Sequence, residues 1–242
     1  MSSFDLAKPV GAMDVNPCGA CPVRSLSVCA ALEDDELDRL NAIVQSLRLE
    51  AHRTVFSEGD PAEHVFNVTS GTVKLYKLLP DGRRQITGFL FAGDFVGLSV
   101  NDKLAYTAET VTPVSLCRFP RKRLDALMDD FPKLQRRLFS MASNELAAAQ
   151  DQMLLLGRKS AREKIASFLL TLSRRAARRG QKENPVHLPM SRSDIADYLG
   201  LTTETVSRTF TQLKSSGAIR LLEGGKVDLS DRDGLLDMAE GL

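Results

Sequence analysis

The sequence predicts an α+β protein: a compact antiparallel β-roll, a long helix, and a C-terminal domain of short helices with a β-hairpin. Three observations predict this order. Short apolar runs separated by turn residues fill residues 51–119, a segment without Pro or Gly follows Pro132, and two short helices joined by Gly200 lie near the C-terminus. With 242 residues, the chain has room for about two domains.

Composition describes an ordinary folded chain: 43% of the residues are hydrophobic and 26% are charged. No apolar run approaches the roughly 18 residues that span a bilayer, so no membrane contact is expected. The N-terminus has no apolar core behind a basic start, which argues against a secretory signal and favours the cytoplasm. Residues 158–242 hold 15 Lys and Arg against 11 Asp and Glu, an excess that suits a polyanionic partner.

Three of the four cysteines, Cys18, Cys21 and Cys29, lie within twelve residues, in a stretch whose prolines and glycine favour a loop. The fourth, Cys117, is far away along the chain. Clustered thiols in a reducing compartment usually indicate metal or redox chemistry. Soft thiolate ligands select iron–sulfur clusters or zinc, and a Cys-x-x-Cys pair also resembles a redox disulfide. The residues alone leave these three interpretations open.

The region from residue 32 to residue 119 is expected to change from helix to strands. Four apolar residues at helical spacing predict a helix over Leu32–Leu49: Leu37, Leu40, Val44 and Leu47. The predicted strands are Val55–Phe56, Val65–Val68, Val73–Leu79, Gln85–Phe91, Phe95–Leu98 and Thr110–Phe119. Many short strands with frequent turns favour an antiparallel barrel or roll.

Helical character returns over Pro120–Met128, and a long helix is predicted from Pro132 to Gly157. Alternating steps of four and three residues, the spacing of a coiled-coil seam, connect Gln135, Phe139, Ala142, Leu146, Ala149 and Met153. The pattern favours a homodimer in which this helix pairs with its copy. A helix packed on its own β domain would use the same residues and is the alternative.

After another predicted helix over Arg158–Arg179, the segment Met190–Gly217 predicts a helix-turn-helix. Ser191 and Asp194 form a capping-box-like start, Gly200 supplies the turn, and Thr202 is placed to cap the second helix. The hairpin that follows, over residues 219–229, would be a wing. Five side chains are expected to face a major groove of double-stranded DNA: Thr203, Glu204, Ser207, Arg208 and Gln212. Two packed helices with a solvated face are the alternative interpretation.

Three segments carry a resemblance to a known family: GRRQITGFLFAGDFVGL at 82–98, LSRRAARRG at 172–180 and SRSDIADYLGLTTETVSR at 191–208. In this order of domains, the chain resembles the CRP/FNR family of bacterial transcription regulators over residues 18–240. With its cysteines, it resembles the oxygen-sensing FNR branch, including FnrN/FixK-like members. The resemblance implies a regulator rather than an enzyme, with a β-roll like that of cyclic-nucleotide-binding domains.

The resemblance also implies four segments and a cofactor. The segments are a cluster-binding arm (1–30), a β-roll sensor domain (31–131), a dimerisation helix (132–157) and a DNA-binding domain (158–242). The implied ligands of one 4Fe-4S cluster are Cys18, Cys21, Cys29 and Cys117. With the cluster intact, the expected dimer regulates anaerobic or microaerobic genes, and Glu204, Ser207 and Arg208 read a TTGAT-type half-site.

Family analogy makes the exposed loop with Asp81, Gly82 and Arg83 a candidate contact for RNA polymerase. The cyclic-nucleotide branch carries a Glu and an Arg-Ser pair where this chain has Leu98 and Tyr106-Thr107, so no cyclic nucleotide is expected. A regulator without a cluster, switched by cysteine oxidation or held together by zinc, is the alternative function. A thiol oxidoreductase is a further one, although the βαβ context of such enzymes is missing.

Overall fold

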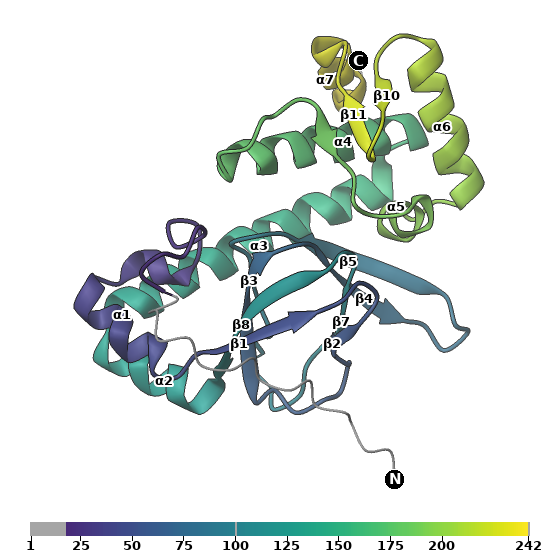
Figure 1. The fold of residues 1–242 in the computed structure, drawn as a ribbon. Helices are drawn as coiled ribbons and strands as arrows, with labels where there is room; N and C mark the ends of the chain where they lie inside the picture. The colour runs from purple at the N-terminus through teal and green to yellow at the C-terminus, as the bar shows by residue number, and fades with distance from the viewer. Residues whose placement is uncertain (1–17, 100, 242) are drawn as a thin grey trace. The chain divides into compact units, whose positions relative to one another are not determined.

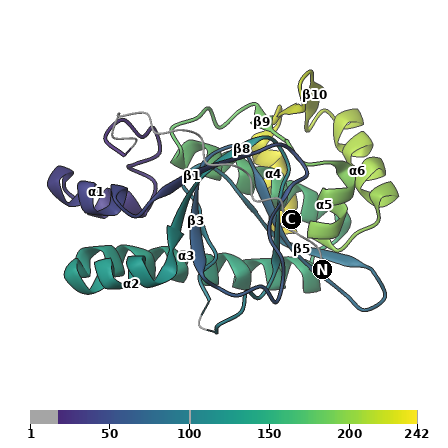
Figure 2. The same ribbon diagram turned by 60° about the horizontal axis from the view of Figure 1, so that its bottom comes forward.

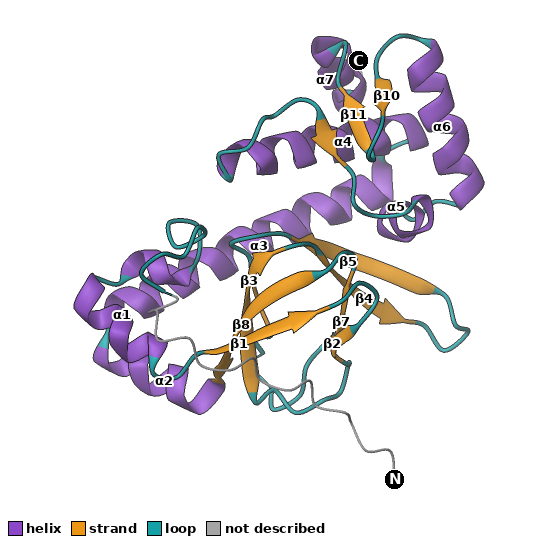
Figure 3. Cartoon of the chain, viewed as in Figure 1, coloured by secondary structure: helices purple, strands orange, loops and turns teal. Residues whose placement is uncertain are grey.

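The computed structural model describes residues 18–99 and 101–241 (Figures 1 and 3). Its contacts divide the chain into two units, one of Met1–Tyr76 with Phe89–Asn144 and one of Lys77–Gly88 with Glu145–Leu242. The first 17 residues of the predicted arm lie outside the described residues, and the finer division into four segments stays a prediction. In the described part of the chain, no helix has the length and apolar character needed to cross a membrane.

Two four-stranded sheets build the β-roll, in the orders β1-β8-β3-β6 and β2-β7-β4-β5. The strands of the first sheet are β1 (Gln45–Leu49), β8 (Val114–Pro120), β3 (His64–Ser70) and β6 (Phe95–Val96). Those of the second are β2 (Thr54–Phe56), β7 (Thr107–Thr110), β4 (Val73–Leu78) and β5 (Arg84–Leu90). The registered pairs are antiparallel, which confirms the predicted β-roll.

The sheet that contains β3 and β8 separates two hydrophobic cores, because successive side chains of a strand point to opposite faces. Phe66 and Val68 of β3 and Leu116 of β8 belong to the core inside the roll. Val65 of β3 and Phe119 of β8 belong to a second core on the outer face. One sheet therefore supports both the roll interior and whatever covers its outer side.

Helices and the cysteine segment cover that outer face. They comprise the 3₁₀ helix η1 (Val28–Ala31), α1 (Asp34–Asn41), α2 (Arg121–Asp130) and the start of the long helix α3 (Pro132–Arg158). Helices α1 and α2 lie side by side in both views (Figures 1 and 2). Leu37, Leu124 and Leu134 anchor the three α-helices in the outer core, where each is at most 1% exposed.

The second unit contains the predicted winged helix-turn-helix. Its helices are α4 (Ala161–Arg178), α5 (Arg192–Leu199), α6 (Thr203–Ser215) and α7 (Arg232–Glu240). Its small sheet has the order β10-β11-β9, formed by Arg220–Leu222, Lys226–Asp228 and Val186–His187. Ser191 and Asp194 make the predicted capping box, Gly200 ends α5 in the left-handed conformation at φ 62°, and Thr202 caps α6.

Residues Lys77–Gly88 belong to the second unit because the hairpin contacts α5. Arg84 forms ion pairs with Asp194 at 3.0 Å and Asp197 at 2.7 Å. Gln85 donates a hydrogen bond to the carbonyl of Asp197 at 2.7 Å. The Pro80–Arg83 turn thus extends from a stretch of chain that is anchored on the first helix of the helix-turn-helix.

Two predictions of secondary structure are wrong. The expected helix over Leu32–Leu49 ends at Asn41, and Gln45–Leu49 forms β1, since pairing with β8 outweighs the local helical spacing. The expected strand over Thr110–Phe119 is two strands in different sheets, β7 and β8. Pro113 between them has no N–H to donate to a ladder, which favours a break in the strand there.

Candidate metal centre and DNA-reading helix

The cysteine segment is a chain of tight turns that lies on the outer core. The N–H of Cys21 donates to the carbonyl of Cys18 at 3.5 Å, and that of Arg24 donates to the carbonyl of Cys21 at 3.1 Å. Ser27 is fully buried, caps η1 and accepts a hydrogen bond from the N–H of Cys29. The predicted loop is therefore a series of hydrogen-bonded turns, and Cys18 and Cys21 lie at the two ends of the first turn.

The fold brings the distant cysteine to this loop. Cys18 and Cys29 are buried in the outer core, Cys117 packs against the same core from β8, and Cys21 is half-buried. All four are free thiols. The Cys18 thiol also donates to the side-chain oxygen of Asn41 on α1 at 3.6 Å.

The cysteines are close enough for the charge of one thiolate to affect the pKa of another. Burial, followed by the charges of Cys29 and Cys21, raises the pKa of Cys18 to about 11. Burial, followed by the charges of Cys29, Cys18 and Cys21, raises the pKa of Cys117 to about 12. Burial also raises the pKa of Cys29. Without a cationic group Cys18, Cys29 and Cys117 keep their protons at neutral pH, because burial and mutual repulsion disfavour the thiolates.

The donor set fits an iron–sulfur group in its chemistry. Four thiols from one loop and one strand suffice for a 4Fe-4S cluster, and binding would replace their protons by positive charge. As folded here, the described residues contain no group of three or more His, Cys, Asp or Glu side chains arranged to hold a metal ion. The fit accordingly rests on the kind of ligand and on the shared burial of the cysteines.

Two contacts that fix the loop are not evident from the sequence. Arg137 on α3 donates from Nη2 to the carbonyl of Leu26 at 3.0 Å and from Nε to that of Ser27 at 3.4 Å. Leu26 also packs on Gly93, where an added Cβ would lie 2.7 Å from the Cβ of Leu26. The Phe91–Asp94 turn and α3 thus hold the loop from two sides. An Arg at the start of a helix gives no sequence signal for such a role.

Helix α6 presents the predicted DNA-reading face. Val206, Phe210 and Leu213 are buried, whereas the five predicted contact residues are exposed: Thr203, Glu204, Ser207, Arg208 and Gln212. A hydrogen bond from its own backbone N–H, then the Thr202 hydroxyl and Arg208, lower the pKa of Glu204. Glu204 is therefore ionised at neutral pH and can accept a hydrogen bond from a cytosine amino group.

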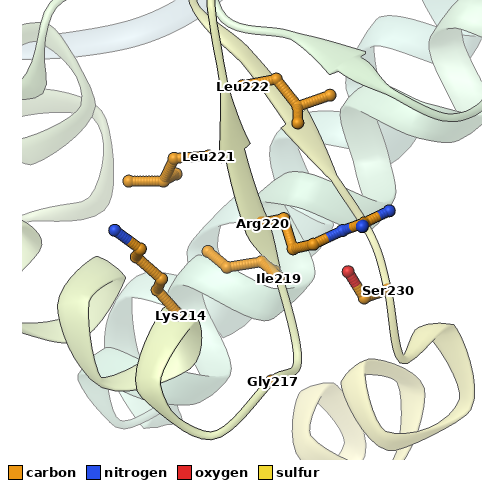
Figure 4. A pocket seen from close by; sticks show the side chains of 7 residues that line it. All are labelled: Lys214, Gly217, Ile219, Arg220, Leu221, Leu222 and Ser230. Atoms are coloured by element: carbon orange, nitrogen blue, oxygen red, sulfur yellow. The ribbon is translucent and has the colours of Figure 1, made fainter.

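The predicted wing is also present, as β10 and β11, with Gly224 and Gly225 at its tip. A shallow hollow of about 570 Å³ lies between α6 and β10, and Figure 4 shows its lining residues: Lys214, Gly217, Ile219, Arg220, Leu221, Leu222 and Ser230. The side chain of Arg220 pairs with Asp228 at 2.9 Å. The lining is mostly apolar, and Lys214 is the basic residue in it that suits contact with a phosphate.

The predicted dimer residues form an exposed stripe along α3, here called the α3 seam: Gln135, Phe139, Ala142, Leu146, Ala149 and Met153. Phe139 is 75% exposed, Leu146 62% and Met153 65%, which is unusual for side chains of this size on one helix. Leu134 and Leu138 on the same helix are buried in the first unit. Pairing of this seam with a second copy of the chain stays a prediction.

The remaining predictions concern the polymerase contact and the absence of a cyclic nucleotide. Asp81, Gly82 and Arg83 are exposed at the hairpin turn, where Asp81 accepts a hydrogen bond from the N–H of Arg83. Leu98 is 43% exposed, and Tyr106 packs on Phe56 with ring centroids 5.9 Å apart. Polymerase contact and the absence of a cyclic nucleotide stay predictions.

Comparison with known proteins agrees with this architecture. Residues 46–131 match the family described as "Cyclic nucleotide-binding domain", and residues 163–238 match the "Crp-like helix-turn-helix domain". The nitrogen fixation regulation protein FixK of Bradyrhizobium diazoefficiens is 44% identical over 208 residues, which cover 86% of this chain and 88% of FixK. The transcriptional activator protein FnrL of Cereibacter sphaeroides is 41% identical over 226 residues, 92% of this chain and 91% of FnrL.

Among solved structures, FixK2 from Bradyrhizobium japonicum is similar with a TM-score of 0.76 and 38% identity, covering 81% of this chain and 97% of FixK2. A β-roll joined to a winged helix-turn-helix, in relatives named as transcription regulators, defines a DNA-binding transcription regulator rather than an enzyme. The chain belongs to the CRP/FNR family. The predicted family, fold class and non-enzymatic character are thereby confirmed.

Replacing Arg137 by Ala should loosen the cysteine loop, because the carbonyls of Leu26 and Ser27 lose their donor. We expect faster amide hydrogen exchange over residues 18–31 in the cluster-free protein, measured by mass spectrometry. The matched control is Arg136→Ala, since Arg136 is an exposed arginine of the same helix turn. Equal exchange in the two variants would show that Arg137 does not hold the loop.

Proposed function

We propose that this regulator responds to oxygen through a 4Fe-4S cluster held by Cys18, Cys21, Cys29 and Cys117. The cluster-bound chain forms a homodimer that binds a TTGAT-type pseudo-palindrome and activates anaerobic or microaerobic genes. The observation that carries the proposal is that Cys18, Cys29 and Cys117 meet at one hydrophobic core, with the half-buried Cys21 in the same loop. The similarity to FnrL, a transcriptional activator protein, supports the activator role.

The chain provides a path from the cysteines to the α3 seam. When bound, a 4Fe-4S cluster supplies an oxygen-sensitive covalent link between the loop and β8. Arg137 binds the loop carbonyls and lies two residues before Phe139, the most exposed large residue of the seam. A change in the loop position therefore acts on the helix turn that begins the seam. After loss of the link, the raised pKa values of Cys18 and Cys117 favour protonated, separate thiols.

The DNA-binding part of the proposal follows from two-fold symmetry. Pairing of two α3 seams would set two α6 helices one turn of DNA apart, about 34 Å, so that each reads one half-site in the major groove. Arg208 suits a guanine edge, Glu204 a cytosine amino group and Ser207 either kind of base. The exposed Lys226 on the wing and the exposed Lys214 on α6 suit the phosphates that flank those bases.

The second candidate is a regulator of the same fold that lacks a cluster. The free, buried thiols would also suit a structural zinc ion, or a switch in which Cys18 and Cys21 become a disulfide. The polymerase contact at Asp81–Arg83 and the cytoplasmic location would be the same for both candidates, so they do not distinguish them. A thiol oxidoreductase would show disulfide-exchange turnover and no binding to DNA.

Analysis of anaerobically purified protein distinguishes cluster from zinc. We expect about four iron and four sulfide per chain, with little zinc. Cys117→Ser should abolish cluster binding, because the remaining three thiols all come from one loop. Ser115→Ala on the same strand is the matched control and should retain the iron and sulfide. Zinc without iron or sulfide would contradict the proposal.

Arg208→Ala should weaken binding to an operator duplex by about 1–3 kcal/mol and relax specificity at one base pair. Fluorescence anisotropy with single-base variants of the TTGAT half-site measures both effects at fixed salt. Arg174→Ala removes an exposed arginine from α4 and should leave the base preference unchanged. If Arg208→Ala binds every duplex as the unmodified protein does, Arg208 does not read a base.

Ala149→Glu should oppose dimer formation, because it places two like charges against each other between the paired seams. Sedimentation velocity at micromolar concentration should show a larger monomer fraction in the cluster-bound protein. Ala148→Glu introduces the same charge on the neighbouring exposed residue, outside the seam, and should remain dimeric. Equal dimer fractions in both variants would place the interface elsewhere.

A further inference from the structure

Asn67 carries a buried polar atom that the fold leaves without a partner. The residue lies in the middle of β3 and is 2% exposed. Its side-chain oxygen Oδ1 accepts no hydrogen bond, and it is the unsatisfied buried side-chain atom found among the described residues. Such an atom lowers the stability of the fold, because the hydrogen bonds that it made with water are not replaced. An apolar side chain would fill this central strand position without that cost.

The strand register places Asn67 beside a cysteine. Asn67 pairs with Cys117 on β8 and, on its other side, with Phe95 on β6. Directly opposite residues of antiparallel strands share one face of the sheet, with Cβ atoms about 4.5–5.5 Å apart. Cys117 and Phe95 both pack against the outer core, which also contains Cys18 and Cys29. The carboxamide of Asn67 therefore belongs to the surroundings of the four thiols.

The chemistry of a carboxamide suits a sulfur neighbour. A half-turn about the Cβ–Cγ bond exchanges its oxygen and its NH₂ group, so the position of the unsatisfied atom is open to a donor. A protonated Cys117 is a weak acceptor and offers this donor little. A thiolate bound to a cluster carries negative charge, and charge-assisted hydrogen bonds are about twice as strong as neutral ones. Hydrogen bonds to cluster sulfurs are one of the factors that set a reduction potential.

We propose that the side-chain N–H of Asn67 donates a hydrogen bond to Sγ of Cys117 when the cluster is bound, and thereby raises the reduction potential of the cluster. This inference rests on the proposed cluster function. The hydrogen bond compensates part of the thiolate charge and provides the partner that the buried carboxamide lacks in the cluster-free chain. Asn67 is thus a residue that tunes the cluster without being one of its ligands.

The test compares Asn67→Val and Asn67→Asp with the unmodified full chain, each loaded anaerobically to the same iron and sulfide content. Asn67→Val removes the donor from a strand position that suits a β-branched residue, and Asn67→Asp keeps the shape but has no N–H. Spectroelectrochemical titration should give a lower reduction potential for both variants. Thr69→Val is the control on the same strand, since its hydroxyl already donates to the carbonyl of Ser115 at 2.9 Å, and it should keep the original potential.

A second measurement compares the stability of the cluster-free proteins, where losing the carboxamide should be favourable. The urea midpoint of Asn67→Val should exceed that of the unmodified chain, because the unpaired carboxamide is gone. Equal potentials in loaded Asn67→Val and unmodified protein would overturn the inference and leave the cluster function intact. A lower urea midpoint for Asn67→Val would show a carboxamide that is already paired, for example by a buried water, and would also overturn it. An unmodified chain that binds no iron and sulfide would overturn both proposals.

Discussion

The alternation of side chains along β3 and β8 is the constraint on which the rest of the first unit depends. Phe66, Val68 and Leu116 point into the roll, so their neighbours Val65, Cys117 and Phe119 must point outward. A shift of one residue in this pairing would move Cys117 into the roll interior, away from Cys18 and Cys29. The packing of the roll interior thereby fixes the face of the sheet on which the fourth thiol lies.

Sequence patterns predicted the elements whose signals are local. Ser191, Gly200 and Thr202 define the helix-turn-helix through caps and a positive φ, and the structure places all three as expected. The pattern failed at residues 45–49, where the spacing of Val44 and Leu47 fits a helix but the partner strand lies about 70 residues further along the chain. A pattern of a few neighbouring residues contains no information about a partner strand so far away, so periodicity could not predict β1.

The candidate site divides in the same way. Residue type and spacing are enough to predict the cysteine site, and helical periodicity predicts the outward residues of α6. The residues that surround the thiols are not recognisable in this way. Arg137 resembles any solvated arginine on a helix, and Asn67 interrupts the apolar run Val65–Val68 without a motif around it. Their roles depend on which strand or loop lies opposite them, and only the folded chain provides that information.

The contact between Arg137 and the loop has a consequence for how such proteins vary. Arg137 binds the carbonyl oxygens of Leu26 and Ser27, and every amino acid has a carbonyl oxygen. The contact therefore depends on the course of the backbone and is indifferent to which side chains the loop carries. Loops with other sequences between the second and third cysteines would dock on the same helix if their turns matched. This makes the segment a replaceable module, open to divergence or to grafting in the laboratory.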